Sequence, residues 1–409
     1  MNVLLSAYAC QPAEGSEPGV GWNIACEVAK SHQVWVLTRL NNQPAIAAYL
    51  SQNPIPNLNF VYLDVLGWTR RWKPGEAGKS VRIHYYLWQI RAFAAARQLH
   101  REIGFDLIHH VTYVQYSTPS FLALLDAPFI WGPVGGGESA PPTFRPTWAP
   151  SAKRYETWRD LSRWVAEADP FVRMTARRST IALATTEDTA DRLRQLKAAP
   201  VKVFGQCGLT AAELQQLGSL PAPPAGVFRF LSIGRLLHWK GFDLGLAAFA
   251  KAQLEGAEYW IVGDGSERSA LTAQIETLGI GDRVKWLGKL SRKETLETLG
   301  DCHTLVHPSL HDSGGFVVLE AMAAGRPVIC LDLGGPATQV TSDTGFKIAA
   351  PDRDRAIAGL AEAMTRLAQT PNLVWQMGAA GRVRSQTVYD WTAKGAFFRE
   401  LYEQIKNNR

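Results

Sequence analysis

One stretch of this chain, residues 307–327, restricts the fold more than any other. It reads HPSLHDSGGFVVLEAMAAGRP and follows the strand-like residues 304–306. The order predicts a strand end, a glycine-containing loop and a helix from about Phe316 that stops at Gly325, with Pro327 starting the next strand. The N–H groups at such a helix start have no intrahelical partners, and the helix dipole adds positive charge there. This stretch therefore predicts a binding site for an anion such as phosphate.

Two carboxylates flank the predicted anion site. Asp312 lies in the loop and Glu320 lies roughly two turns into the helix, so Glu320 could face a polyol such as a ribose while Asp312 reaches another part of the same ligand. A bare pair of acids at this spacing is common on protein surfaces. The longer string PSL-x-D-x-x-G-x-VVLEAMA-x-G-x-PVI is far more specific. It resembles the Glu-x7-Glu signature of retaining family 4 glycosyltransferases of the GT-B fold, with Asp312 in place of the first Glu.

The resemblance implies an α/β protein of the GT-B fold, in which two Rossmann-like doubly wound domains face each other across a cleft. The length of 409 residues also favours two domains, and 46% hydrophobic with 20% charged residues is ordinary for a soluble α/β protein. A run rich in proline and small residues at 209–226 predicts the linker. We therefore expect an N-terminal, acceptor-side domain of residues 1–208, joined by a C-terminal helix at about 389–409, and a nucleotide-sugar-binding domain of residues 209–388.

Two cations lie near the start of the predicted second domain. Arg235 follows the predicted strand 228–233, and Lys240 lies at the head of the next helix. In isolation such cations are usually surface charges, but family 4 members carry this pair as G-R-x5–6-K-G and use it to neutralise the donor diphosphate. The resemblance also implies donor contacts from both halves of the chain, at Gly19, Gly21, Arg235, Lys240, Asp264, Gly265, Leu290, Gly315, Phe316, Val317 and Glu320.

The first half of the chain opens with a strand, a long loop and a helix, and Gly19 and Gly21 lie where the loop and the helix meet. Glycines there let the backbone approach a ligand, which is also how a dinucleotide-binding fingerprint works. Against that interpretation, the loop is long for a Rossmann turn, Ile24 stands where a small residue is expected, and Arg39 rather than an acid follows the second strand. An NAD(P)-dependent oxidoreductase therefore stays as an alternative.

Acceptor-binding residues are expected at two strand ends in the first half, because ligands bind at the carboxyl edge of open α/β sheets. The strand 106–111 ends in DLIHHVTY, and family 4 enzymes often place a histidine there, which makes His109 and His110 candidates. A histidine pair on a strand is otherwise most often one core histidine and one partly exposed histidine, so a catalytic role and a structural role stay open. The strand 129–131 is followed by GPVGGGES, which is either an acceptor-contacting loop or a plain tight turn. Its candidate residues are Gly136, Gly137 and Glu138.

The resemblance implies sugar transfer with retention of configuration. As the anomeric C–O bond breaks, charge builds on the diphosphate, and Arg235, Lys240 and the amides of residues 315–317 would stabilise it. The departing phosphate would deprotonate the acceptor, while Asp312 would hold sugar hydroxyls. Neither a metal nor a cofactor is expected beyond the nucleoside-diphosphate sugar itself, since the His and Cys residues make no recognisable ligand set. The catalytic candidates are Asp312, His109, His110, Arg235 and Lys240.

A non-catalytic sugar-nucleotide-binding protein would share these binding residues, and the Asp312 substitution is the feature that favours it. The net charge of +6 and the pI near 9.0 favour an anionic partner. Basic and aromatic residues alternate between residues 68 and 101, which is typical of docking on an anionic membrane and equally of a solvated helix over a loop. Helical spacing predicts that Ile83, Leu87 and Ile90 face the core. The basic residues of this stretch are Arg70, Arg71, Lys73, Lys79, Arg82, Arg91, Arg97 and Arg101.

The expected partners are a nucleotide-sugar donor, a glycan or lipid-linked acceptor and an anionic membrane surface. Nucleic acid is not expected, because nothing in the chain resembles an RRM, KH or OB module. No apolar run reaches the ~20 residues that span a bilayer, and the N-terminus lacks a basic region and a cleavage site. The five cysteines are scattered, as in a reducing compartment. We expect a cytoplasmic protein, either free or peripheral on the inner face of the membrane.

Overall fold

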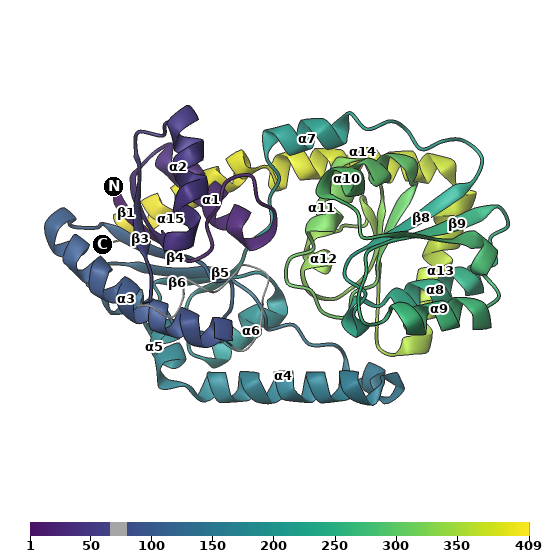
Figure 1. Ribbon diagram of the computed structural model, residues 1–409, viewed down its shortest axis with the longest axis horizontal. Coiled ribbons are helices and arrows are strands. Elements are labelled where there is room, and N and C mark those ends of the chain that lie inside the picture. The colour runs from purple at the N-terminus through teal and green to yellow at the C-terminus, as the bar shows by residue number, and fades with distance from the viewer. Residues whose placement is uncertain (66–79, 409) are drawn as a thin grey trace. The chain divides into compact units, whose positions relative to one another are not determined.

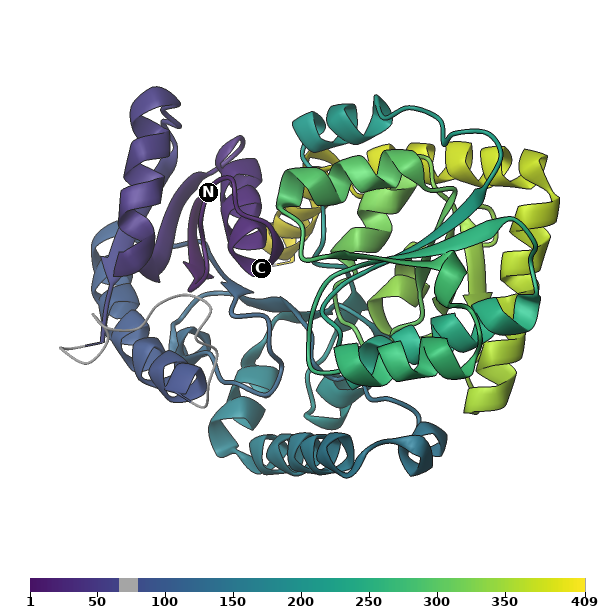
Figure 2. The ribbon, with the colours of Figure 1, turned by 45° about the vertical axis from the view of Figure 1, so that its right-hand side comes forward.

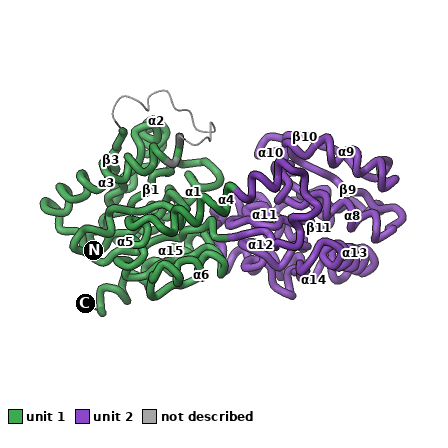
Figure 3. Tube along the Cα trace, turned by 90° about the horizontal axis from the view of Figure 1, so that it is seen from below, with its two compact units in different colours: residues 1–137, 158–206, 391–409 green, residues 138–157, 207–390 purple. Residues whose placement is uncertain are grey.

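The computed structural model describes residues 1–65 and 80–408 and divides into two compact units. Unit 1 contains residues 1–137, 158–206 and 391–409, and unit 2 contains residues 138–157 and 207–390 (Figure 3). The two predicted domains remain a prediction, because a division by packing does not test which segments fold independently.

Unit 1 is built on a parallel sheet with the strand order β3-β2-β1-β4-β5-β6-β7 (Figure 1). Helices α1, α2 and α15 lie on one face of the sheet, and α3, α5 and α6 lie on the other (Figure 1). Because helices cover both faces, the central strands β1, β4 and β5 are buried along almost their whole length, as is typical of a parallel sheet. The strands are β1 Asn2–Ala7, β2 Gln33–Arg39, β3 Leu58–Leu63, β4 Leu107–Thr112, β5 Phe129–Val134, β6 Ile181–Ala184 and β7 Val201–Val203. The helices are α1 Ser16–Ala29, α2 Gln43–Gln52, α3 Ser80–Ile103, α5 Pro170–Arg178, α6 Glu187–Gln195 and α15 Trp391–Asn407, with short 3-10 turns at Leu40–Asn42 and Phe121–Leu124.

Unit 2 repeats this architecture on a parallel sheet with the order β10-β9-β8-β11-β12-β13. Figure 2 shows this sheet with helices on both sides. Consecutive residues of β8, Phe230 and Leu231, point into two different apolar clusters, one on each face of the sheet. The strands are β8 Phe228–Ile233, β9 Ala257–Val262, β10 Val284–Gly288, β11 Thr304–His307, β12 Val328–Leu331 and β13 Gly345–Ile348. The helices are α7 Ala211–Gly218, α8 Phe242–Ala252, α9 Arg268–Thr277, α10 Arg292–Asp301, α11 Phe316–Ala323, α12 Gly334–Gln339, α13 Arg353–Gln369 and α14 Pro371–Val388, with 3-10 turns at Pro142–Thr147, His238–Lys240 and Gly281–Arg283. Helix α4, Pro150–Ala168, contributes residues to both units.

Each sheet has a point where the strand order reverses direction. The first strand of unit 1, β1, pairs with β2 on one side and with β4 on the other, and β8 of unit 2 pairs in the same way with β9 and β11. Ligands of open parallel sheets bind at the carboxyl ends of the strands at this reversal. The fold class predicted from the sequence, two doubly wound α/β sheets, is confirmed.

Helix α11 begins and ends as predicted. It starts at Phe316, directly after Gly315, whose φ of 72° is in the left-handed region that favours glycine. At its end Gly325 has a φ of 73°, and the N–H groups of Gly325 and Arg326 donate to the carbonyls of Met322 and Ala321. These two bonds form a glycine C-cap, which satisfies the last carbonyls of the helix.

The predicted linker at 209–226 contains helix α7, so it is not irregular along its whole length, while the domain boundary itself stays a prediction. Helix α7 begins after Thr210, whose hydroxyl accepts from the Glu213 N–H while the Glu213 carboxylate accepts from the Thr210 N–H. Leu214 and Leu217 are buried in the unit 2 core. A reciprocal cap and two buried leucines outweigh the proline-rich composition that follows.

Helix α3 buries the face opposite to the predicted one. The side chains of Ile83, Leu87 and Ile90 are 54%, 38% and 51% exposed, whereas Tyr85 and Trp88 are fully buried. Both buried rings pack edge-on against the ring of Tyr8, at 5.1 and 5.2 Å between centroids. Burying large aromatic rings removes more apolar surface from water than burying the aliphatic face would. Arg70, Arg71, Lys73 and Lys79 of the predicted membrane-docking stretch lie outside the described residues.

Candidate functional site

An ion pair joins the loops that follow β8 and β11 in unit 2. The Lys240 ammonium lies 2.5 Å from Oδ2 of Asp312, which also contacts Nε2 of His307 at 3.3 Å. The other oxygen, Oδ1, accepts from the Gly314 N–H at 3.2 Å. Gly241 follows Lys240 with a φ of 67°, and a Cβ there would lie 2.0 Å from the Pro308 carbonyl oxygen. Only glycine lets the two loops approach this closely.

The surroundings of Asp312 keep its carboxyl ionised. Burial opposes ionisation of Asp312, but the Lys240 ammonium and the His307 imidazole outweigh it and hold the pKa of the carboxyl well below its usual range. Burial likewise lowers the pKa of His307, and its bond to Asp312 only partly offsets that effect. At neutral pH the Asp312 carboxyl is therefore ionised and the His307 imidazole is uncharged.

The start of helix α11 presents three backbone donors beside Asp312. The N–H groups of Gly315, Phe316 and Val317 donate to no other group in the described part of the chain. The loop before them is held in place, since the Gln339 amide donates to the Gly314 carbonyl at 2.5 Å and the Gly335 N–H donates to the Asp312 carbonyl at 2.7 Å. A preformed loop with unpaired donors at a helix N-terminus is suited to bind an anion.

Glu320 is buried in the same helix and is paired with a residue that the sequence analysis missed. Its side chain is 3% exposed, and Oε1 contacts Nη1 of Arg292 at 2.5 Å. Burial raises the pKa of Glu320, and the Arg292 guanidinium opposes this without cancelling it. Arg292 also reaches Glu213 at 3.4 Å. Arg292 precedes Glu320 by 28 residues and forms no motif with it, so no local signal could have revealed the pair.

Arg235 follows β8 after one residue, Gly234, and is exposed. Within residues 1–65 and 80–408 its guanidinium makes no ion pair or hydrogen bond, which leaves the charge available to a ligand. The loop after β9 is hydrogen-bonded to the loop that carries Arg235, because the Leu236 N–H donates to the Asp264 carbonyl at 2.9 Å. A Cβ at Gly265 would lie 2.4 Å from the Leu236 carbonyl oxygen, which explains this glycine by packing. Leu290 is half-buried against the unit 2 core.

The predicted glycine sites of unit 1 are explained by packing. Gly19 and Gly21 lie inside helix α1, which begins at Ser16 and therefore earlier than the predicted junction of loop and helix at these glycines. A Cβ at Gly19 or Gly21 would lie 2.2 or 2.1 Å from a carbonyl oxygen of the preceding loop. Gly137 is close to Thr189, whose hydroxyl accepts from the Gly137 N–H at 3.1 Å. Gly136 has a φ of 93°, and Glu138 is buried and is counted with unit 2.

His109 and His110 are both buried on β4. Nε2 of His109 donates to the Gly132 carbonyl at 2.5 Å, so its Nδ1 accepts from the Tyr402 hydroxyl at 2.6 Å. Nε2 of His110 lies 3.2 Å from the Tyr113 carbonyl, while its Nδ1 has no partner among the described residues. Burial lowers the pKa of His109 to about 3 and that of His110 to about 4. His109 therefore has no nitrogen left for a substrate, whereas His110 has one.

The described residues contain neither a metal-binding cluster nor a membrane-spanning helix. In the described ranges, no three His, Cys, Asp or Glu side chains are arranged so that they could hold a metal ion. The helices that the structure describes include none with the length and apolar character needed to cross a bilayer.

Comparison with known proteins connects this geometry to a family. Residues 222–384 match the family described as glycosyl transferases group 1. The lipopolysaccharide core biosynthesis glycosyltransferase LpsD of Rhizobium meliloti is 30% identical over 181 residues, which are 44% of this chain and 51% of that protein. The chain thus spans about half the length of the curated relatives it matches.

Solved structures extend the likeness to the whole fold. Sucrose-phosphate synthase from Thermosynechococcus elongatus superposes with a TM-score of 0.66 at 20% identity over 100% of both chains. The Anabaena protein HepE, solved in complex with UDP and glucose, superposes with a TM-score of 0.60 at 17% identity over 99% of this chain and 100% of that chain. Residues 222–384 of this chain belong to the group 1, or family 4, glycosyltransferases, and the chain has the GT-B fold.

Proposed function

We propose that this protein is a retaining glycosyltransferase that moves a hexosyl unit from a nucleoside-diphosphate sugar to a glycan or lipid-linked acceptor without a metal ion. The observation that carries the proposal is the group of anion-binding donors in unit 2. Lys240, the unpaired Arg235 and the free N–H groups at the start of α11 all lie at the carboxyl end of β8 and β11. A diphosphate has the charge and the acceptor oxygens to pair with Arg235 and these N–H groups, and it can replace Asp312 as the partner of Lys240.

Binding of the donor exchanges one anion for another at Lys240. When the diphosphate arrives, Lys240 turns from the Asp312 carboxylate to a phosphate oxygen, and Asp312 becomes free to accept from sugar hydroxyls. As the anomeric C–O bond breaks, its electron pair moves onto the diphosphate, where the cations and amides stabilise it. The acceptor oxygen forms its bond on the same face of the sugar, and its proton passes to the departing phosphate.

Glu320 is the proposed ribose ligand. Arg292 holds one carboxylate oxygen, which leaves the second oxygen to accept from a ribose hydroxyl. Asp264, Gly265 and Leu290 would contribute contacts around the nucleotide, and Gly19 and Gly21 remain proposed donor contacts from unit 1. On the acceptor side we retain His110, with the free nitrogen described above, ahead of His109. Gly136, Gly137 and Glu138 also remain acceptor-side proposals.

The proposal is tested first by ligand binding. A ligand that binds only the folded state raises its stability by mass action, so UDP-, GDP- and ADP-sugars are compared by thermal unfolding. We test UDP-glucose first because HepE was solved with UDP and glucose. Transfer and hydrolysis of the stabilising donor are then measured with and without EDTA. Unchanged turnover in EDTA supports metal independence, whereas binding without any turnover would favour the sugar-nucleotide-binding protein.

A lipid-linked acceptor is supported by an exposed apolar surface on helices α4 and α5. On α4, Trp158, Leu161, Trp164 and Val165 are 61%, 48%, 67% and 56% exposed, and Phe171 of α5 is 46% exposed. The same helix α5 carries exposed Arg173, Arg177 and Arg178 and no acid. Exposed tryptophans beside clustered arginines suit the interface of an anionic membrane. We therefore propose that the protein is cytoplasmic and binds the inner membrane face peripherally through this surface.

Vesicle flotation tests the membrane proposal. Wild type is expected to float with vesicles that contain phosphatidylglycerol at low salt and to be released at high salt, since each basic residue near the surface contributes about 1 kcal/mol that salt screens. The double variant Trp158→Glu/Trp164→Glu is expected to stay unbound. The matched control is Trp375→Glu, which changes a tryptophan that is 58% exposed on α14 of unit 2. A wild type that ignores anionic vesicles at low salt would point to a soluble acceptor.

A further inference from the structure

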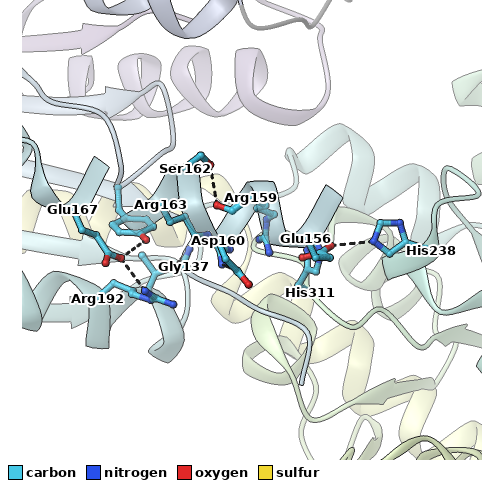
Figure 4. Close-up of polar contacts among 12 residues, drawn as sticks. Gly137, Glu156, Arg159, Asp160, Ser162, Arg163, Glu167, Arg192, His238 and His311 are labelled. Atoms are coloured by element: carbon cyan, nitrogen blue, oxygen red, sulfur yellow. Dashed lines mark hydrogen bonds and ion pairs between the residues drawn. The ribbon is translucent and has the colours of Figure 1, made fainter. Parts of the chain in front are cut away.

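A buried glutamate on helix α4 contacts two histidines that no motif in the sequence singled out. Glu156 is 1% exposed, and its Oε1 lies 3.0 Å from Nε2 of His238 and 3.0 Å from Nε2 of His311 (Figure 4). All three residues belong to unit 2. Since a carboxylate only accepts hydrogen bonds, both imidazoles must present Nε2–H to the same oxygen. One buried acceptor thus fixes the position of two rings.

The two histidines lie in the loops that carry the proposed donor-binding residues. His238 is two residues before Lys240, and His311 is directly before Asp312. Lys240 and Asp312 are joined by their ion pair. The contacts therefore form a closed network. It runs from Glu156 through one loop, across the ion pair and back through the other loop.

Aromatic contacts add to this network of hydrogen bonds and the ion pair. The ring of Trp239 stacks on the ring of Tyr155 at 5.0 Å and on the ring of His311 at 5.3 Å between centroids. The ring of Trp148 also packs edge-on against His238 at 5.2 Å. The main chains of the loops meet as well, because the Leu310 N–H donates to the Trp239 carbonyl at 2.8 Å. Side chains from residues 148–156 therefore hold the loops from outside, in addition to their own contact.

We propose that Glu156 is a positioning residue that sets the geometry of Lys240 and Asp312 for the donor diphosphate. This role rests on the proposed function, because it matters only if these two residues receive a donor. Glu156 does not touch the donor. It acts by holding the imidazoles of His238 and His311, so that Lys240 keeps its place when Asp312 releases it. Catalysis depends steeply on such placement, since an error of about 1 Å can cost on the order of 100-fold in rate.

The experiment compares two variants of Glu156 with a neighbouring control. Glu156→Ala removes the acceptor for both histidines, and we expect kcat/KM for the donor to fall on the order of 100-fold. Glu156→Gln keeps an acceptor oxygen at the same reach, and we expect it to restore most of the activity. The matched control Thr157→Ala changes an exposed residue whose hydroxyl bonds only within α4, and we expect wild-type kinetics. Rescue by Gln but not by Ala distinguishes positioning from a charge effect.

A second measurement does not depend on activity. Trypsin cleavage after Lys240 reports on the mobility of its loop, and we expect it to be several-fold faster in Glu156→Ala than in wild type. Cleavage after Lys251, on the exposed surface of α8, serves as the internal reference. Wild-type kcat/KM and unchanged cleavage in Glu156→Ala would overturn the proposal. So would a variant that loses thermal stability but keeps the wild-type KM and kcat per folded molecule.

The two measurements also separate this inference from the proposed function. If wild type binds none of the nucleotide sugars, the proposed function fails, and the role of Glu156 in donor use fails with it. If wild type binds and turns over a donor but Glu156→Ala behaves identically, only the positioning role fails. Faster cleavage together with lower kcat/KM supports both.

Discussion

Strands β4 and β11 occupy the same place in their two sheets, and both carry histidine near the carboxyl end. β4 lies beside the first strand of unit 1 and β11 beside the first strand of unit 2, at the point where the strand order reverses. On β4, His109 and His110 contact a phenol hydroxyl and main-chain carbonyls. On β11, His307 contacts the Asp312 carboxylate, which holds the Lys240 ammonium.

The difference shows what makes a strand end available to a ligand. At β4 the polar groups of His109 are satisfied by neutral partners inside the protein, and reassigning them would leave buried donors and acceptors unpaired. At β11 the uncharged His307 contacts a carboxylate that is paired with an ammonium, and Lys240 loses little when it exchanges that carboxylate for a phosphate. The same position in the topology thus serves packing in one unit and anion binding in the other.

The largest effect is expected from Lys240→Ala. Removing the cation that faces the developing diphosphate should lower the transfer rate by roughly 10²–10³, which is typical for the loss of one preorganised donor. Steady-state kinetics with the donor identified by thermal stabilisation measure the effect. Lys251→Ala, an exposed lysine on the following helix, is the control and should leave the rate unchanged. Wild-type turnover in Lys240→Ala would mean that the cation near β11 has no role in transfer, and the proposed functional difference between β11 and β4 would fail.

The second prediction uses acid to test the neutral character of β4. The pKa of His109 is lowered to about 3 and that of His110 to about 4, from an ordinary value of 6.5. Below pH 6.5 the unfolded chain therefore binds protons that the folded chain does not, and folding becomes less favourable as pH falls towards these values. At about pH 5 each histidine should cost about 2 kcal/mol of unfolding free energy.

Urea denaturation between pH 7 and pH 5 measures this loss of unfolding free energy. The unfolding free energy of the His109→Phe variant should fall less than that of wild type over the same range. Its donor affinity at pH 7 should equal that of wild type. A stability that does not change with pH would mean that the histidines of β4 have polar or solvated surroundings, and the contrast between the two strands would disappear.

Local signals in the sequence predicted the helix at the donor site well. A glycine needed at a left-handed φ stands on each side of α11, and the apolar run between Gly315 and Gly325 leaves a single acid, Glu320. Such signals depend on residues close in the chain. The family string and the order of strands and helices therefore predicted the fold class and the place of the anion site.

Partners that are distant in the sequence could not be predicted. Arg292 reaches Glu320 from another helix, and Glu156 reaches His311 across 155 residues, so neither contact has a spacing rule. Helix α3 illustrates a different limit. Its pattern permits either face to be buried, and the choice of Tyr85 and Trp88 depends on the ring of Tyr8, which the helix pattern does not contain.

The third prediction concerns the buried acid beside the charged strand end. Glu320→Gln should keep the fold but lower the affinity for the nucleotide about tenfold or more, because the ribose hydroxyl then donates to a neutral amide oxygen instead of a carboxylate. Arg292→Gln is the matched variant, since it removes the partner of Glu320 without touching the proposed ribose contact. Isothermal titration with the nucleoside diphosphate measures both. Equal affinity in wild type and Glu320→Gln would make Glu320 a structural residue, comparable to His109 on β4.

The smallest effect is expected from Asp312→Glu, which restores the residue that the family string carries at this position. The longer side chain keeps its charge and can still pair with Lys240. Asp312 uses its short reach to accept from the Gly314 N–H, and a glutamate would lose that local bond. These effects oppose each other, so we expect donor affinity and transfer rate to change only a few-fold.

Asp312→Asn is the contrasting variant, because it keeps the length, removes the charge and leaves Lys240 unpaired. We expect it to bind the diphosphate at least as tightly as wild type but to transfer sugar more slowly. If Asp312→Glu instead turned a protein without turnover into an active transferase, the wild-type chain would be a sugar-nucleotide-binding protein whose charged strand end binds donor without transferring it.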